Sequence, residues 1–130
     1  MKTDERGKKM GKDLKDYTLD EIFQKVEEVL NKEPGPIQGI QAVYQYEISG
    51  EGGGTYQLHL SDGKAKVEKG EAANADCTLQ MSLDDFRDLL LGNLNGTAAF
   101  MAGKLKVKGN LGLAMKMENV LRQYDVKQYI

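Results

Sequence analysis

Five short segments of this chain alternate apolar with polar residues, and this alternation limits the folds that the chain can adopt. In residues 40–49 every second residue is apolar, and the same period recurs in 56–60, 65–67, 77–81 and 105–107. Successive side chains of a β-strand point to opposite faces, so each segment is expected to be a strand with one buried face. A sheet covered by helices on both faces would be apolar on both sides. The chain is therefore predicted to be α+β, with its helices on one face of the sheet.

The polar side of these five segments is expected to face water. It carries amides, one histidine and several lysines: Gln45, Gln57, His59, Lys66, Gln80, Lys104, Lys106 and Lys108. Two glycine-containing connections, residues 50–54 and the pair Asp62-Gly63, are typical of hairpins between antiparallel strands. The segments are therefore predicted to form one mostly antiparallel sheet with an exposed face.

Helix signals are found on both sides of the strand segments. Four helices are expected, over residues 19–31, 83–92, 96–102 and 110–123. The first begins with the capping-box pattern of Thr18 and Glu21, and the second with Ser82 as N-cap. The last helix is apolar over more than the roughly 100° stripe that a helix lying on one core needs.

The 130 residues contain no internal repeat and no linker, and this length suffices for one hydrophobic core. Residues 1–13 are polar and are expected to be a flexible tail, so that residues 14–130 form a single domain. The net charge of −2 gives no general attraction to nucleic acid. No apolar run reaches the roughly 18 residues of a membrane span. The single cysteine, Cys77, agrees with a reducing, cytoplasmic setting.

The sequence contains no convincing constellation of catalytic or metal-binding residues. A nucleophile and its base must lie within hydrogen-bonding distance. The alternation places Cys77 on the apolar side of its strand and His59, the only histidine, on the polar side of another. One histidine and one cysteine are also too few for a His/Cys metal cluster. The chain is therefore predicted not to be an enzyme and to hold no metal and no cofactor.

A row of lysines, Lys104, Lys106 and Lys108, alternates along the last strand segment. Such a row is common on a solvated edge strand, where lysines discourage unwanted pairing with other strands. Contact with acidic lipid head groups or with a partner protein is the alternative. The sequence favours the solvated strand and leaves the alternative open.

Bulky, adaptable apolar side chains are concentrated towards the C-terminus. Phe100, Met101, Met115 and Met117 fall on the two helices that flank the last strand. Methionine adapts its shape to varied apolar partners. With the apolar residues of the second helix, these side chains fit either an ordinary core or the wall of a cavity. The residues alone favour the ordinary core.

A longer motif resembles a known family. Residues 75–117, and more loosely 18–122, are similar to the sterol carrier protein 2 (SCP-2) domain. The resemblance is carried by ADCTLQMS at residues 75–82, DFRDLL at 85–90 and, above all, the ungapped run AFMAGKLKVKGN at 99–110. Gly96 departs from the pattern, because many relatives have proline there, and this should loosen the start of the third helix.

The resemblance implies a five-stranded, mostly antiparallel mixed sheet with about four to five helices on one face, which enclose an apolar tunnel. Domains of this family bind fatty acids, fatty acyl-CoA, phospholipids or sterols and move them without catalysing a reaction. Carried over by position, the residues that line the tunnel are Phe86, Leu90, Leu94, Phe100, Met101, Leu113, Met117, Val120 and Leu121.

Three functions follow from these observations, in order of preference. The first is non-catalytic intracellular lipid binding or transfer, with transient contacts to a membrane surface or an enzyme. The second is an accessory module that supports a lipid-metabolising enzyme by binding it through the polar face of the sheet. An enzyme acting alone comes third, because the sequence contains no convergent site.

Overall fold

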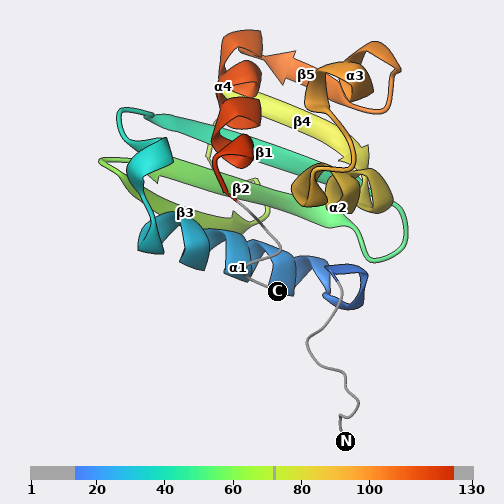
Figure 1. Ribbon diagram of the computed structural model, residues 1–130, viewed down its shortest axis with the longest axis horizontal. Helices are drawn as coiled ribbons and strands as arrows, with labels where there is room; N and C mark the ends of the chain where they lie inside the picture. The colour runs from blue at the N-terminus through green and yellow to red at the C-terminus, as the bar shows by residue number, and fades with distance from the viewer. Residues whose placement is uncertain (1–13, 72, 125–130) are drawn as a thin grey trace, which may run out of the picture.

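The predicted strands form one five-stranded mixed sheet in the computed structural model, which describes residues 14–71 and 73–124 (Figure 1). The strands are β1 (Ala42–Ser49), β2 (Gly54–Ser61), β3 (Lys64–Lys69), β4 (Cys77–Ser82) and β5 (Lys106–Gly109). Their order is β3-β2-β1-β4-β5, with β1 and β4 parallel and the other neighbours antiparallel. The predicted tail, 1–13, lies outside the described residues. The boundaries of the single domain, 14–130, stay a prediction.

The antiparallel half of the sheet is built on the two predicted hairpins. Asp62 and Gly63 have φ angles of 54° and 72°, the left-handed conformation that a two-residue type I′ turn requires. This turn places Ser61 opposite Lys64. The connection over residues 50–53 likewise joins β1 to β2 as an antiparallel pair. Both hairpins were predictable because their turns depend on local residue types.

Helices cover one face of this sheet. They are α1 (Leu19–Lys32), α2 (Leu83–Leu91), α3 (Gly96–Met101) and α4 (Leu111–Arg122), with short 3-10 helices η1 (Leu14–Asp16) and η2 (Gly35–Ile37). In Figure 1, α1, α2 and α4 lie in front of the sheet or along its β3 edge, and α3 lies beside β5. None of the helices in the described residues has the length and apolar character to span a bilayer. The α+β prediction is confirmed.

Helix α1 begins with the predicted capping box. The Glu21 N–H donates a hydrogen bond to Thr18 Oγ1 at 3.2 Å, and the Thr18 N–H donates to Glu21 Oε1 at 2.8 Å. Two backbone donors that the first turn cannot satisfy are therefore bonded to side chains. Helix α2 has Ser82 as its N-cap and ends at Gly92, whose φ of 81° is left-handed.

Replacing Thr18 with alanine is expected to lower the free energy of unfolding by about 1 kcal/mol, because the Glu21 N–H loses its acceptor. Urea unfolding followed by circular dichroism measures this loss. Thr97→Ala, at an exposed position in the first turn of α3, is the control and should change stability by less than about 0.5 kcal/mol. Equal losses in the two variants would contradict the capping role of Thr18.

Helix α1 also closes the edge of the sheet formed by β3. The side-chain amide of Asn31 donates to the Ala65 carbonyl oxygen and accepts from the Ala65 N–H, both at 2.8 Å. The Glu27 carboxylate accepts from the Val67 N–H at 2.7 Å. Because β3 is the last strand on this side, these bonds satisfy backbone groups that would otherwise be open to pairing with another chain. Helix α1 is therefore fixed to the sheet by polar as well as apolar contacts.

The outer face of the sheet is less exposed than the sequence predicts. Gln57 is fully buried and Gln45 is only 7% exposed. Part of the segment that joins β3 to β4 lies against Gln57: Gln57 Nε2 donates to the Ala73 carbonyl oxygen at 2.7 Å, and the Ala73 N–H donates back to Gln57 Oε1 at 3.2 Å. Gln57 Nε2 also donates to Gln45 Oε1 at 2.9 Å. The expectation that these two amides face water is wrong, because a connection without a periodic pattern bonds to Gln57, and Gln57 bonds to Gln45.

Four aromatic rings meet where α1 and α2 pack on the sheet. The ring centroid of Phe23 lies 4.4 Å from that of Tyr56, 5.3 Å from that of Phe86 and 5.5 Å from that of Tyr46. These separations are those of favourable stacked and edge-to-face pairs. All four residues are buried. They join both helices to β1 and β2.

Candidate functional site

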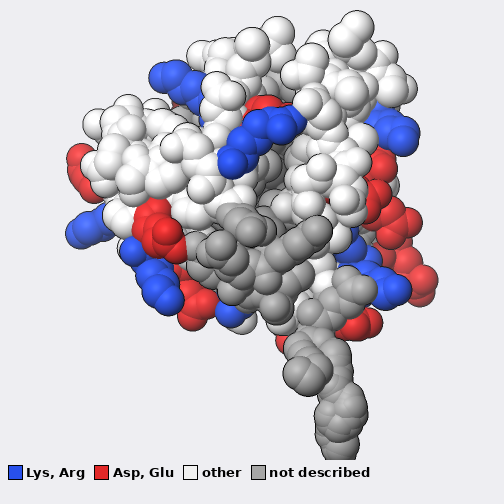
Figure 2. All heavy atoms as spheres, in the orientation of Figure 1, with Lys and Arg blue, Asp and Glu red and all other residues white. Residues whose placement is uncertain are grey.

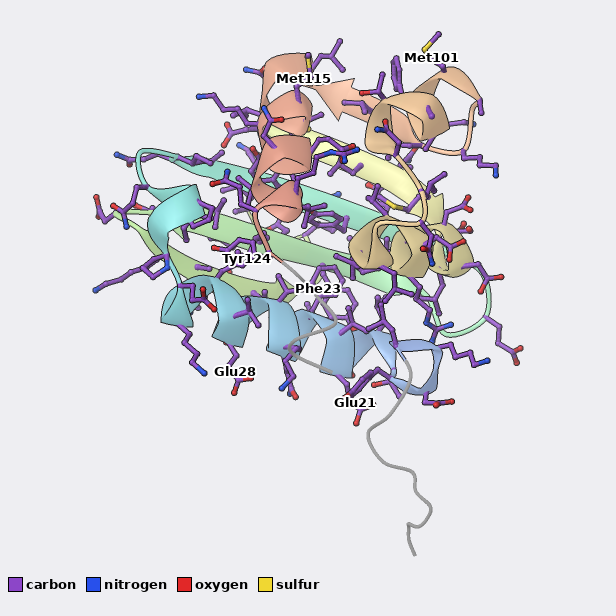
Figure 3. The ribbon with its side chains drawn as sticks, viewed as in Figure 1. Glu21, Phe23, Glu28, Met101, Met115 and Tyr124 are labelled. Carbon is purple, nitrogen blue, oxygen red and sulfur yellow. The ribbon has the colours of Figure 1, made fainter. Side chains whose placement is uncertain are left out.

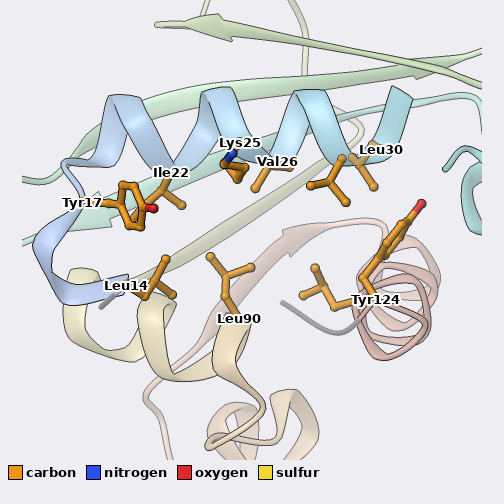
Figure 4. Close-up of a pocket in the computed structure, with 10 residues that line it drawn as sticks. Leu14, Tyr17, Ile22, Lys25, Val26, Leu30, Leu90 and Tyr124 are labelled. Atoms are coloured by element: carbon orange, nitrogen blue, oxygen red, sulfur yellow. The ribbon is translucent and has the colours of Figure 1, made fainter. Parts of the chain in front are cut away.

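An apolar cavity lies between α1 on one side and α2 and α4 on the other (Figure 4). It has two adjoining spaces, about 60 Å³ nearer the surface and about 30 Å³ nearer the sheet, which share Val26, Leu30, Leu90 and Leu121 as lining residues. We call the two spaces together the inner cavity. The outer space is also lined by Leu14, Tyr17, Ile22, Lys25, Val29 and Tyr124. The inner space is also lined by Phe23, Tyr46, Leu58, Phe86, Met117 and Val120.

The helical period of α1 supplies one wall of the inner cavity. Ile22, Val26 and Val29 are spaced by four and three residues and therefore lie on one face of the helix. In Figure 4 the side chains of α1 and those of the facing wall point towards each other across the cavity. Leu90 comes from the end of α2, and Leu121 from the end of α4. The cavity is thus formed where two helix ends meet the middle of a third helix.

Lys25 is the only charged residue among the described residues that line the inner cavity. Its Nζ lies 3.1 Å from Glu28 Oε1, and both side chains are partly open to solvent. The rings of Tyr17 and Tyr124 line the same outer space. An apolar chain inside the cavity would therefore have a cation near its outer end.

A second, more open hollow lies at the β5 end of the sheet. It has a volume of about 230 Å³ and is formed by α3, β5 and α4. It is lined by Gly96, Thr97, Phe100, Leu105, Val107, Leu111, Ala114, Met115 and Glu118. We call it the tip groove. Among the described residues, none lines both the tip groove and the inner cavity.

The structure divides the nine residues that were predicted to line a lipid tunnel. Phe86, Leu90, Met117, Val120 and Leu121 come together around the inner cavity. They approach it from α2 and α4, two of the three helices that the prediction used. Their role in binding a ligand, like the tunnel itself, stays a prediction.

The other four predicted residues lie outside the inner cavity. Phe100 lines the tip groove, and Met101 is exposed and points away from the body of the molecule (Figure 3). Leu94 is partly buried in the connection between α2 and α3. Leu113 packs against the core, and its carbonyl oxygen accepts a hydrogen bond from the Tyr44 hydroxyl at 2.8 Å. Their role in binding a ligand also stays a prediction.

Sequence reasoning missed the wall that α1 contributes. The apolar stripe of α1, which includes Val26 and Leu30, is visible in the sequence, but it predicts only an amphipathic helix over residues 19–31. Whether an apolar residue of α1 packs in the core or lines a cavity depends on how closely α2 and α4 approach α1. The sequence pattern of α1 alone does not contain that information. Leu14 and Tyr17 precede the helix and carry no periodic signal. Only the tertiary structure brings them to the cavity.

The residues considered for catalysis do not meet. Cys77 is fully buried, and burial raises the pKa of its thiol, so the thiol stays protonated at neutral pH and is a weak nucleophile. His59 lies on a different strand, with its Nε2 3.0 Å from Glu68 Oε1. Within residues 14–71 and 73–124, no group of three or more His, Cys, Asp or Glu side chains is placed to hold a metal ion. The inner cavity is therefore the candidate functional site.

Comparison with known proteins gives matches over most of the chain. Residues 23–122 match the model of the SCP-2 sterol transfer family. Hydroxysteroid dehydrogenase-like protein 2 of Xenopus laevis is 39% identical over 122 residues, which are 93% of this chain and 29% of that protein. Sterol carrier protein 2 of Homo sapiens is 34% identical over 106 residues, which are 78% of this chain and 19% of that protein. The chain thus spans less than a third of either relative.

A solved structure shares the fold. The solution structure of the sterol carrier protein domain 2 of Helicoverpa armigera superposes with a TM-score of 0.72 at 28% sequence identity. The superposition covers 90% of this chain and 95% of that one. The sheet and the helices described above are therefore those of a known domain type.

Proposed function

The chain belongs to the SCP-2 sterol transfer family, and from that premise we propose that it binds the apolar part of a lipid in the inner cavity and carries it without chemical change. The observation that supports this proposal is the lining of the cavity, which is apolar apart from Lys25 among the described residues. The ligands proposed are fatty acids, fatty acyl-CoA, phospholipids or sterols. The single cysteine, Cys77, is buried and unpaired, which supports the proposal that the protein works in the reducing cytoplasm.

Burial of an acyl chain supplies the free energy for binding. At about 0.8 kcal/mol per methylene, a 16-carbon chain gains on the order of 13 kcal/mol. Lost freedom of motion and ordering of side chains oppose much of this gain, so a dissociation constant on the order of micromolar is expected. The inner cavity is narrow, so its walls must move apart to admit a chain. Met117 lines the inner space, and its flexible side chain can change shape as the walls move.

Lys25 favours an anionic head group among the proposed ligands. Its ammonium group lines the outer space of the cavity and is already beside one carboxylate, that of Glu28. A fatty acid bound with its tail towards Phe86 and Met117 would bring its own carboxylate to the same cation. This orientation leaves the charged group near water and the chain among apolar side chains.

Filling the cavity should block the ligand. Val26→Trp is expected to weaken the binding of a fluorescent fatty acid by at least about tenfold, because Val26 lines both spaces and the larger ring would occupy them. Gln24→Trp, exposed on the same helix, is the matched control and should leave the affinity unchanged. Fluorescence titration of the delipidated proteins measures both constants.

Two further measurements make this test decisive. The melting temperature of Val26→Trp shows whether the fold is retained, and Val26→Phe gives a smaller increase in volume if it is not. Wild-type affinity in well-folded Val26 variants would show that the ligand binds elsewhere. A delipidated wild-type chain that binds no fatty acid at concentrations well above micromolar would refute the proposal.

The second candidate is an accessory module for a lipid-metabolising enzyme. The observation that favours it is the Xenopus laevis relative, a longer protein named hydroxysteroid dehydrogenase-like protein 2 of which this chain matches 29%. In that protein the matching part is accompanied by other sequence. A chain that binds no lipid but forms a defined complex with one such enzyme in analytical ultracentrifugation would favour this candidate over the first.

A further inference from the structure

We propose that the β5 end of the molecule is a docking surface for anionic phospholipid membranes. The surface is made by residues 96–117, which include α3, β5 and the first half of α4; we call it the tip. This proposal goes beyond lipid binding in the inner cavity and uses other residues.

Exposed large apolar side chains gather at the tip. The four in the described chain are Phe100, Met101, Leu111 and Met115, and they are 45%, 82%, 49% and 64% exposed. Figure 3 shows Met101 and Met115 at the same end of the molecule, pointing away from the sheet. Phe100, Leu111 and Met115 line the tip groove, most of whose lining residues are apolar. Clustered exposure of this kind marks a surface that meets another apolar phase or partner.

The tip also carries charge of one sign. Residues 96–117 contain four of the 18 Lys and Arg residues of the chain and none of its 20 Asp and Glu residues. The tip therefore has a formal charge of +4, whereas the remainder, with 14 basic and 20 acidic residues, has −6. Glu118, which follows this range and lines the tip groove, is paired with Arg122, whose Nε lies 3.3 Å from Glu118 Oε1. In the view of Figure 2, the surface over α3 and the start of α4 is largely uncharged, and the acidic side chains lie mostly elsewhere.

The lysines border the apolar side chains. Lys106 and Lys108 alternate with Val107 on β5, so these two lysines and Val107, which lines the tip groove, lie on opposite sides of this edge strand. Lys104 and Leu105 immediately precede β5, and Leu105 also lines the tip groove. The fourth lysine of the tip follows Met115 on α4. Apolar side chains are thus bordered by long cationic ones, whose ammonium groups can reach head groups while their stems stay near the apolar phase.

Three of the four lysines, Lys104, Lys106 and Lys116, form no ion pair with a carboxylate of a described residue. The fourth lysine, Lys108, is close enough to Glu47 to affect it. The pKa of Glu47 is lowered chiefly by hydrogen bonds from Gln80 and Gln45, and to a smaller extent by the positive charge of Lys108. Most of the positive charge of the tip is therefore available to anionic lipids.

A membrane fits this composition better than a protein partner does. Lysine is depleted in protein–protein interfaces, because its flexible, strongly hydrated side chain is costly to bury. At an anionic membrane each lysine near the surface instead strengthens binding by about fivefold. Exposed Met and Phe side chains can enter the boundary between head groups and acyl chains without requiring a complementary shape.

The test is flotation of the full chain with vesicles. We expect it to bind vesicles of equal parts phosphatidylcholine and phosphatidylglycerol, and to bind pure phosphatidylcholine vesicles far more weakly. Lys104→Gln/Lys106→Gln should weaken binding by about fivefold for each lysine, and added salt should weaken wild-type binding. The matched control, Lys32→Gln/Lys64→Gln, removes the same charge from exposed positions outside the tip and should bind nearly as wild type does.

The apolar half of the proposal needs its own variant. Met101→Ser/Met115→Ser should weaken vesicle binding by about tenfold or more without altering the melting temperature, because both side chains are exposed. A polarity-sensitive dye on Met101→Cys should shift to the blue on adding anionic vesicles, whereas the same dye on Glu28→Cys should not. The native Cys77 is buried and should not take up the dye.

Several outcomes would overturn the proposal. They are no binding of the wild type to anionic vesicles, equal losses in the two lysine pairs, and full binding by the methionine variant. Lipid-free self-association that the methionine substitutions abolish would assign the tip to a second copy of the chain instead. Two measurements distinguish this proposal from that of lipid binding in the inner cavity. The tip variants should keep their affinity for fatty acid, and Val26→Trp should keep its binding to vesicles.

Discussion

Replacing Phe23 with alanine should lower the free energy of unfolding by about 3–5 kcal/mol. The ring is buried and lies within 5.5 Å, centroid to centroid, of three other aromatic rings. Its removal loses apolar burial, leaves a void beside the inner cavity and breaks the contact that joins α1 to both α2 and the sheet. Urea unfolding monitored by circular dichroism measures the loss.

Phe100→Ala is the matched control for Phe23→Ala. It removes the same atoms from a side chain that is 45% exposed at the tip, so its cost should be below about 1 kcal/mol. A large loss in Phe100→Ala, or a small one in Phe23→Ala, would contradict the division of the aromatic residues between core and surface. The pair tests packing alone, because neither residue is charged or hydrogen-bonded through its side chain.

Gly109→Ala should cost about 2–5 kcal/mol, since two separate penalties combine. The φ of Gly109 is +89°, a left-handed conformation that costs an alanine roughly 1–2 kcal/mol. A Cβ at this position would also lie 2.7 Å from the Asp76 carbonyl oxygen, and relieving such a clash costs roughly 1–3 kcal/mol more. The same oxygen accepts the Asn110 N–H at 3.0 Å, so the clash disturbs the junction of β5 with α4.

Gly103→Ala separates the two penalties. Gly103 has a similar φ of +79°, but a Cβ there would have no heavy atom within 4 Å. Its cost should be only the roughly 1–2 kcal/mol of backbone strain. Thermal and urea unfolding of the two variants gives the difference. Equal losses would show that the close approach of Gly109 to β4 is not what requires glycine there.

The parts of the fold that follow from the sequence are those set by neighbouring residues. The capping box of Thr18 and Glu21 and the Asp62-Gly63 turn each contain their own determinants within a few residues. Burial of Gln57 does not, because it depends on the connection between β3 and β4 crossing the outer face. No periodic pattern marks that crossing. The parallel pairing of β1 with β4 is likewise set by tertiary structure.

The candidate site was predictable only in part, and α4 shows why. Met115 and Met117 belong to one apolar run, but residues two apart on a helix point in nearly opposite directions. Met117 therefore lines the inner cavity, while Met115 is exposed beside the tip groove. The family resemblance selected apolar residues near the right helices. It did not say which of them would line the inner cavity and which would lie outside it.

The hydrogen bonds from Asn31 and Glu27 to β3 give the molecule a preferred direction of opening. Separating α1 from the sheet would break all three of these bonds, each worth about 1 kcal/mol, in addition to apolar contacts. Helix α1 is therefore held firmly on the edge of the sheet. The facing wall is tied to the two ends of α1 by a bond from Arg87 to the Tyr17 carbonyl oxygen and one from the Tyr124 hydroxyl to the Glu33 carbonyl oxygen. Because fewer bonds hold this wall than hold α1 on β3, we expect the Leu90 and Leu121 side to move first when the cavity widens.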